Sequence, residues 1–384
     1  MFSKIVSKIE PSASLSISNK AKQMKAEGLE VIDLSVGQPD FPLPPNVKET
    51  IRKALAEDKV GYTLSRGILE LREAIARDIK RKSGLTYSPA EIIVTPGAKQ
   101  AILTALLTLL NAGDEVIVFE PCWHSYRAMV QMAGGAYLPV AVLKRGDLQK
   151  KEQEIIAQIT NKTKAVLLNN PVNPTGAVWS LEDLRTIAKI AKQNNLWVIA
   201  DEIYDEILFD DYKVHCFAGL SAMKERTILI NGFSKTYAMP GLRLGYLAGS
   251  KEFTDQAAKI HEHSSTCACS LSQYAGLASL SGENKDYVEK NQKEYQKRRD
   301  FVFEQLSQVP FKCLEPQGAF YIFFGLRETK MNSSALAEFF LEKAGVALIP
   351  GTAFGKAGEG YLRMSFAVDL KTLKTALVKI KSTI

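Results

Sequence analysis

The chain has 384 residues, of which 46% are hydrophobic and 24% charged, a composition typical of globular proteins rather than of disordered, collagen-like or membrane proteins. Its length, at roughly 150 residues per domain, favours two domains. The net charge of +7 is spread along the chain and no basic run is longer than residues 80–82, so we expect no nucleic-acid partner, which would require a basic stripe with interleaved aromatics.

The N-terminal segment, residues 1–16, lacks the apolar core of a signal peptide, and the chain contains no stretch of about 18 apolar residues. The five cysteines are odd in number and scattered, which does not fit a disulfide framework. We therefore expect a cytoplasmic protein with reduced cysteines and no membrane partner.

Residues 31–47, VIDLSVGQPDFPLPPNV, combine an apolar strand with a Pro-rich turn that cannot be helical, and we expect this segment to cross between domains. From about residue 90 to 250, short runs rich in Val and Ile then alternate with amphipathic helical stretches such as 99–110 and 181–193. The expected strands are EIIVT (91–95), EVIVFE (115–120), AVLLNN (165–170), LWVIAD (196–201), TILIN (227–231) and LGYLAG (244–249). This alternation predicts an α/β fold with a mostly parallel sheet covered on both faces by helices.

The C-terminal third has a different pattern. Residues 284–306 are polar with a few apolar positions and predict one long, mostly exposed helix that connects two domains. Beyond it, strands are expected at 319–324 and 361–366, and helices at 334–343 and 370–382. We therefore expect a large domain of residues 45–284 and a smaller α/β domain formed by residues 1–44 and 285–384.

Polar residues gather directly after the predicted strands, where ligands of open parallel sheets bind. They lie in Pro96–Lys99, Pro121–Trp123, Pro171–Gly176, Asp201–Tyr204 and Gly232–Lys235. Each has an ordinary explanation by itself, such as a turn, a helix cap, a packed aromatic or a solvated lysine. Together, however, the five adjacent strand ends supply a helix start, an aromatic plate, an amide, a carboxylate and an amine. This combination indicates a binding site.

Pyridoxal phosphate (PLP) catalysis uses such a set. Its aldehyde needs a lysine, its pyridine nitrogen a carboxylate, its phosphate a helix N-terminus and an arginine, and its ring an aromatic plate and donors to the phenolic oxygen. The candidates are Lys235 for the Schiff base, Asp201 for the nitrogen, residues 97–99 and Arg243 for the phosphate, Trp123 for the plate, and Asn173 and Tyr204 for the oxygen.

Seven segments, in order over nearly the whole chain, resemble class I aminotransferases of the aspartate aminotransferase type. They are LSVGQPDF, PGAKQA, NNPVNPTGAV, ADEIYDEI, SKTYAMPGLRLGY, GAFYIF and LRMSFA. The resemblance implies a fold-type I PLP enzyme that exchanges amino groups between amino acids and 2-oxo acids and works as a homodimer with active sites at the subunit interface.

The resemblance also assigns roles to residues. Lys235 carries the cofactor and then moves the proton, while Asp201, Tyr204, Asn173, Trp123 and Arg243 hold the cofactor as described above. Ala98 and Lys99 bind the phosphate through their backbone amides, and Tyr62 reaches the phosphate in the neighbouring subunit. Arg363 binds the substrate α-carboxylate with Gly37 beside it; without the resemblance, Arg363 would be interpreted as a surface residue on an edge strand.

Two departures from the family pattern concern the site. Gly232 stands where many relatives have a Ser or Thr that bonds the phosphate, and Ser234 is the candidate substitute. Gln38 stands where a glutamate is common. We expect no metal site, because the cluster His261, His263, Cys267 and Cys269 lacks the cysteine spacing of zinc sites and fits a helix end entering a loop.

The substrate is predicted to be an acidic amino acid, aspartate or glutamate, with 2-oxoglutarate as a partner. The stretch of residues 261–272 contains no arginine for a distal carboxylate, but Lys99, Ser12 and Ser14 match positions used for it in another branch of the family. The alternatives are an aromatic, methionine, kynurenine or prephenate aminotransferase, or a C–S β-lyase. A transcription regulator with this fold would need a DNA-binding domain, for which residues 1–33 are too few.

Overall fold

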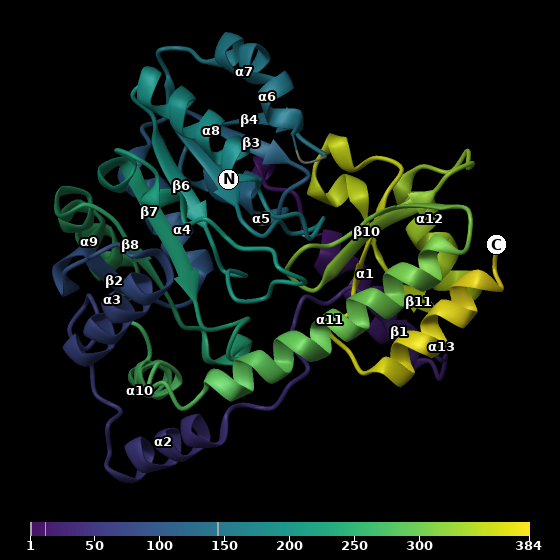
Figure 1. Cartoon of the computed structure of the whole chain (residues 1–384), viewed down its shortest axis with the longest axis horizontal. Coiled ribbons are helices and arrows are strands. Elements are labelled where there is room, and N and C mark those ends of the chain that lie inside the picture. The colour runs from purple at the N-terminus through teal and green to yellow at the C-terminus, as the bar shows by residue number, and fades with distance from the viewer. Residues whose placement is uncertain (1, 12, 144–145) are drawn as a thin grey trace.

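In the computed structural model, which describes residues 2–11, 13–143 and 146–384, a seven-stranded sheet forms the centre of the larger part of the molecule (Figure 1). The strand order is β2-β8-β7-β6-β5-β3-β4, and β8 alone among these strands runs against its neighbours. The strands are β2 Ile92–Thr95, β3 Glu115–Glu120, β4 Ala136–Ala141, β5 Thr163–Asn169, β6 Trp197–Asp201, β7 Thr227–Gly232 and β8 Gly245–Ala248. The predicted α/β class with a mostly parallel sheet is confirmed.

All six predicted strands are present, and β4 was not predicted. It lies at the sheet edge, pairs only with β3, and has one buried residue, with Pro139 in its middle. A proline without a backbone donor is tolerated at an edge strand, but it also removes the sequence signal of a strand.

Helices cover both faces of the sheet because its central strands are apolar on both sides. On β5, Leu167 packs against one cluster of buried residues with Ile102 and Met129, whereas Val166 and Leu168 pack on the other side with Ile187. The helices of the larger part are α2 Pro45–Ala56, α3 Leu69–Ser83, α4 Ala98–Leu109, α5 Ser125–Met132, α6 Asp147–Lys150, α7 Glu152–Gln158, α8 Leu181–Gln193, α9 Lys251–Ser265 and α10 Ser270–Ser279.

The predicted long helix is α11, Lys285–Ser307, which extends from α10 toward the C-terminal helix (Figure 1). Its outer face is exposed, but it also has a buried stripe that contains two arginines. Arg298 binds both carboxylate oxygens of Asp40 at 2.8 and 2.9 Å, and Arg299 binds both of Asp210 at 2.9 Å. The helix therefore joins segments that are far apart in the sequence.

A second, antiparallel sheet of order β12-β13-β10-β9 lies beside α11, and a two-stranded sheet pairs β1 with β11. The elements here are α1 Ala13–Ala26, β1 Ile32–Asp33, β9 Phe311–Leu314, β10 Tyr321–Leu326, α12 Ser333–Phe339, β11 Val346–Ala347, β12 Ile349–Pro350, β13 Leu362–Ser365 and α13 Leu370–Lys381. Because β1 pairs with β11, the N-terminal segment packs with C-terminal residues. The domain boundaries at residues 44 and 284 stay a prediction.

Within the described ranges, no helix is both long and apolar enough to cross a bilayer. The five cysteines are unpaired.

Candidate active site

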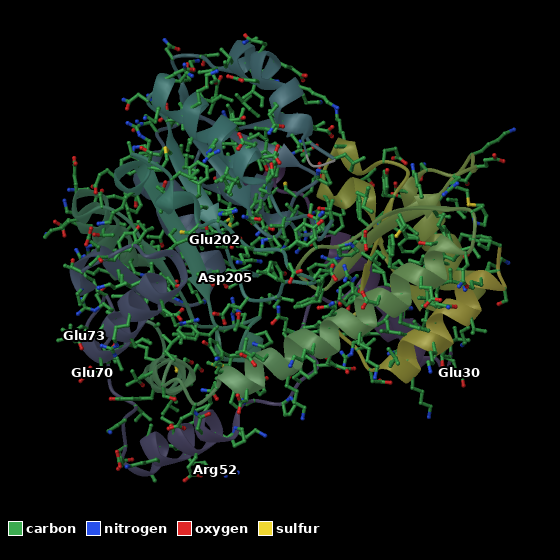
Figure 2. The ribbon with its side chains drawn as sticks, viewed as in Figure 1. Glu30, Arg52, Glu70, Glu73, Glu202 and Asp205 are labelled. Atoms are coloured by element: carbon green, nitrogen blue, oxygen red, sulfur yellow. The ribbon has the colours of Figure 1, made fainter. Side chains whose placement is uncertain are left out.

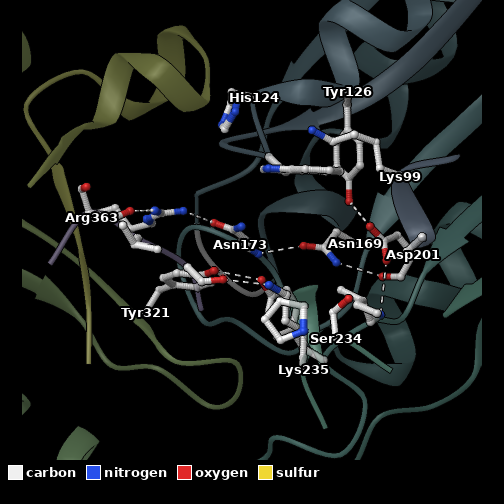
Figure 3. A pocket seen from close by; sticks show the side chains of 18 of the residues that line it. Lys99, His124, Tyr126, Asn169, Asn173, Asp201, Ser234, Lys235, Tyr321 and Arg363 are labelled. Carbon is white, nitrogen blue, oxygen red and sulfur yellow. Dashed lines mark hydrogen bonds between the residues drawn. The ribbon is translucent and has the colours of Figure 1, made fainter. Parts of the chain in front are cut away.

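A cavity of about 620 Å³ lies where the carboxyl ends of the parallel strands meet the second sheet (Figure 3). Ser234 and Lys235 follow β7, Asp201 ends β6, and Arg243 lies just before the reversed strand β8, which begins at the same edge. Eleven of the predicted site residues line this cavity: Gly37, Ala98, Lys99, Trp123, Asn173, Asp201, Tyr204, Ser234, Lys235, Arg243 and Arg363.

The cavity is strongly cationic. Lys99, Lys235, Arg243 and Arg363 line it, and Asp201 contributes the one carboxylate among the described lining residues. Four cations around one cavity create a positive potential that favours ligands with several negative charges.

Asp201 lines the cavity and is 3% exposed. Its Oδ2 accepts a hydrogen bond of 2.6 Å from the Tyr126 hydroxyl, and its Oδ1 accepts one from the Ile203 backbone N–H. Burial raises the pKa of this carboxyl to about 6, although both hydrogen bonds lower it. A cationic N–H donor from a ligand would therefore find a rigid carboxylate that lacks a cationic partner within hydrogen-bond distance among the described residues.

Lys235 extends its amine into the cavity, where Nζ donates a hydrogen bond of 2.8 Å to the backbone carbonyl of Gly37. Burial, followed by the charges of Arg363 and Arg243, lowers the pKa of the Lys235 ammonium to about 8. An amine with this pKa can hold and release a proton near neutral pH. Gly37 is required at its position because a Cβ there would overlap the Tyr321 hydroxyl.

An anion cradle lies at the start of α4. Gly97 has φ +85° and precedes α4, whose first two residues, Ala98 and Lys99, line the cavity. The first N–H groups of a helix lack partners within the helix and are available to an anion. The Arg243 guanidinium Nη2 would lie 2.5 Å from a Cβ at position 97, so arginine and helix start are close together. Helix amides, an arginine and the adjacent Ser234 form a site typical of phosphate groups.

Arg363, on β13, is 3% exposed and faces the cavity from the second sheet. Its Nη1 donates to Asn173 Oδ1 at 3.0 Å and its Nη2 to the Ser35 carbonyl at 2.5 Å, while its buried Nε has no protein acceptor. Its guanidinium carbon lies 4.3 Å from the centre of the Tyr321 ring. A buried, fixed guanidinium with an unpaired donor is suited to bind a carboxylate.

The sequence did not reveal Tyr126, Asn169, His124 and Tyr321 as site residues, although all four line the cavity. Tyr321 lies within an apolar stretch and resembles a core residue, whereas Tyr126 stands between Ser125 and Arg127 with no pattern that marks a site residue. Asn169 Oδ1 accepts a hydrogen bond of 2.8 Å from the Asn173 N–H and so fixes that loop, a role that only the folded structure makes visible. Asn169 lies at the end of the same predicted strand that precedes Asn173, so the search for polar residues at strand ends would also have included it.

Three predicted residues are not among the lining residues. Tyr62 is 91% exposed, so its assignment to a neighbouring subunit's site stays a prediction. Ser12 lies outside the described residues, and Ser14 falls in α1 with its side chain outside the description. Ser18, one helical turn beyond Ser14, does line the cavity.

The two departures from the family pattern have different surroundings. Gly232 is buried in β7, where a Cβ would lie 2.9 Å from both the Gly245 Cα and the Leu244 carbonyl, so a larger residue would force the strands apart. Gln38 is exposed and does not line the cavity. For the cluster around His261, the described part of the chain holds no group of three or more possible metal ligands.

The loop that carries Asp201 has a second face, turned away from the cavity. Figure 2 labels Glu202 and Asp205 near the middle of the view; Glu202 is buried and Asp205 is partly buried. Glu202 Oε1 accepts a hydrogen bond of 2.9 Å from the Phe217 N–H. Burial raises the pKa of the Glu202 carboxyl to about 8; Asp205 raises it further, and the contacts with Phe217, Cys216 and Lys82 lower it.

Glu202→Gln is therefore expected to stabilise the protein at alkaline pH. The folded pKa of about 8 lies above the ordinary value of 4.5, so the folded state binds the proton more tightly and the wild type loses stability as pH rises from about 4.5 to 8. Glutamine cannot ionise, and its advantage should grow over this range to at least about 1 kcal/mol. Urea unfolding between pH 5 and 9 measures it; a gap that does not change with pH would contradict the expectation.

Comparison with known proteins agrees with this geometry. The family model described as aminotransferase class I and II matches residues 30–380. An aspartate aminotransferase of Thermotoga maritima is 39% identical over 99% of this chain and 98% of its own, and aromatic-amino-acid aminotransferase 2 of Thermococcus litoralis is 37% identical over 94% and 93%. The aspartate aminotransferase of Thermus thermophilus, solved with maleate, superposes with a TM-score of 0.94 at 35% identity and full coverage of both chains.

Proposed function

Because the chain belongs to the class I and II aminotransferases, we propose that it uses pyridoxal phosphate to move an amino group between an acidic L-amino acid and a 2-oxo acid. The acidic substrate is aspartate or glutamate, and the oxo acid is 2-oxoglutarate or a similar compound. The observation that carries this proposal is the cavity in which four cations surround one carboxylate, since cofactor and substrate together bring a phosphate and two or more carboxylates.

The residues of the cavity fit the cofactor, and class I aminotransferases depend on it. We assign Asp201 to the pyridine nitrogen, because its carboxylate is held by Tyr126 at 2.6 Å, and the start of α4 with Ser234 and Arg243 to the phosphate. Trp123 is assigned to the ring face, and Asn173 and Tyr204 to the phenolic oxygen. When bound, pyridoxal phosphate supplies an aldehyde carbon for the amino group and a ring that accepts electrons.

The chain's own residues then orient the substrate and move the proton. The Arg363 guanidinium fork binds the α-carboxylate and so fixes the direction of the bond between the α-carbon and its hydrogen. The Lys235 Nζ, with its pKa of about 8, takes the proton from the α-carbon as a general base. The Tyr204 hydroxyl lies 3.0 Å from the Tyr321 hydroxyl, and the Lys235 Nζ lies 5.9 Å from the centre of the Tyr204 ring.

Incubation of the purified enzyme with L-aspartate and 2-oxoglutarate tests the proposal, and formation of glutamate and oxaloacetate is expected. Phenylalanine, methionine, kynurenine and prephenate are assayed in parallel. The rings of Trp123, Tyr126 and Tyr321 around the cavity favour an aromatic substrate as the second candidate, as does the aromatic-amino-acid aminotransferase relative. Pyruvate and ammonia released from cystathionine would indicate a C–S β-lyase instead.

Lys99→Ala is expected to raise KM for aspartate about tenfold and to change KM for phenylalanine little. The Lys99 Nζ lies 4.9 Å from the centre of the Trp123 ring at the cavity wall, and a side-chain cation there attracts a distal carboxylate but not a phenyl group. Steady-state kinetics with both substrates measure the ratio. Equal losses would assign the side chain to the phosphate or to the fold.

We also propose a homodimer in which Tyr62 completes the neighbouring site. Val60, Tyr62 and Leu64 are 56, 91 and 65% exposed, an apolar strip that a second subunit would cover. Mixing Tyr62→Phe subunits with Lys235→Ala subunits, each inactive alone, tests this proposal. If the site is shared, each mixed dimer has one site with both Lys235 and Tyr62 intact, and activity should return.

A further inference from the structure

His124 lies in the wall between two cavities. It directly precedes α5, and its side chain lines both the main cavity and a second cavity of about 340 Å³ that is bounded by the N-terminal segment and the loop around Phe354. Figure 3 shows its ring between Arg363 and Lys99 in this view. None of the roles proposed above uses this side chain.

The wall is a series of three rings with a cation at each end. The Arg363 guanidinium carbon lies 4.9 Å from the centre of the Phe354 ring, which lies 6.4 Å from the His124 ring. The His124 ring lies 6.0 Å from the Trp123 ring, and the Lys99 Nζ lies 4.9 Å from the centre of the Trp123 ring. The imidazole is therefore in the middle of the series, between the two cations assigned to the two carboxylates of an acidic substrate.

The electrostatic setting keeps this imidazole uncharged. Burial, followed by the charges of Arg363 and Lys99, lowers the pKa of His124 to about 4. A neutral imidazole has one N–H donor and one acceptor nitrogen. It can thus donate a hydrogen bond to a carboxylate without adding a third positive charge beside two others.

We infer that His124 is a specificity-determining residue of this aminotransferase, and that its imidazole N–H donates a hydrogen bond to the distal carboxylate of an acidic substrate beside Lys99. The inference rests on the proposed function, since it requires a substrate with a second carboxylate. An aromatic side chain in the same place would instead contact the His124 and Trp123 rings and would gain nothing from the donor.

The test measures binding without turnover. Maleate, a dicarboxylate, and 3-phenylpropionate, an aromatic monocarboxylate, are titrated into the PLP-loaded enzyme by calorimetry. His124→Phe keeps a ring and removes the donor, and it should raise the Kd for maleate about tenfold while the Kd for phenylpropionate stays within about threefold. His124→Gln keeps an N–H donor and should recover most of the maleate affinity.

His215→Phe, at an exposed histidine far along the chain in the loop after β6, is the matched control and should change neither Kd. His124→Met provides a second donor-free variant in case phenylalanine impairs folding. Equal changes for both ligands, or an unchanged maleate Kd in both donor-free variants, would overturn the inference.

The two proposals can fail separately. A wild-type enzyme that neither binds maleate nor converts aspartate would overturn the acidic substrate and His124's role with it. An enzyme that converts aspartate, but whose maleate affinity is independent of position 124, would overturn the role of His124 alone.

Discussion

Lys235→Ala is expected to lower kcat by about 10³-fold or more while the protein still folds and binds pyridoxal phosphate. The variant loses the amine that carries the cofactor and the general base that moves the proton, and general acid–base catalysis alone contributes about 10² to 10⁴-fold. The Lys235 side chain lines the cavity, and its Nζ donates a hydrogen bond of 2.8 Å to the Gly37 carbonyl. The other lysine that lines the cavity, Lys99, is held against Trp123.

Single-turnover and steady-state assays measure the loss, and borohydride reduction followed by mass spectrometry locates the covalently bound cofactor. The cofactor mass should appear on Lys235 in the wild type and on no residue of the variant. Lys224→Ala, which removes a lysine paired with Glu91 at 3.2 Å outside the site, is the control and should retain both the label and activity. Sustained turnover by Lys235→Ala, or a label on another lysine, would refute the assignment.

Arg363→Lys is expected to lower kcat/KM by about 10² to 10⁴-fold for every amino acid substrate. Lysine keeps the charge but not the planar fork, and hydrogen bonds to charged groups contribute about 1.5–3 kcal/mol each. Lysine has fewer N–H donors than arginine, so the Asn173 Oδ1 or the Ser35 carbonyl would also lose its present donor. Orientation of the α-carbon should suffer, so kcat falls as well as affinity.

The effect should be uniform because the α-carboxylate is common to all substrates. Kinetics with aspartate and with phenylalanine should therefore fall in parallel, in contrast to the selective effect expected of Lys99→Ala. Arg185→Lys, at an exposed arginine paired with Glu182 on α8, serves as the control and should be close to wild type. A loss confined to aspartate would place Arg363 at the distal rather than the α-carboxylate.

Much of the large sheet could be predicted from the sequence because its strands are buried on both faces, and burial on both faces leaves continuous runs of Val, Ile and Leu. The strand-end rule then found Asp201, Asn173 and Lys235, since parallel strands bring their carboxyl ends to one edge. The edge strand β4 could not be found in this way, because a partly exposed strand with Pro139 has no such run.

The remaining site residues depend on contacts between distant segments. Arg363 lies in a fully buried strand and has no sequence signal of its own; the family resemblance alone indicated it. Tyr126 stands between Ser125 and Arg127 at the start of α5, and only its 2.6 Å hydrogen bond to Asp201, 75 residues away, distinguishes it from a core tyrosine. Local patterns predict elements, whereas such long-range pairs are set by packing.

The concentration of positive charge in the cavity affects the free energy of unfolding. Lys99, Lys235, Arg243 and Arg363 line one cavity and Arg243 repels both lysines, so a bound polyanion offsets this repulsion as well as enabling the reaction. A ligand present at 100 times its Kd adds about 2.7 kcal/mol to the free energy of unfolding. If the enzyme binds pyridoxal phosphate as proposed, the amount of folded enzyme depends on the supply of phosphorylated vitamin B6, and depletion of the vitamin is expected to reduce the number of enzyme molecules and not only the fraction that is active.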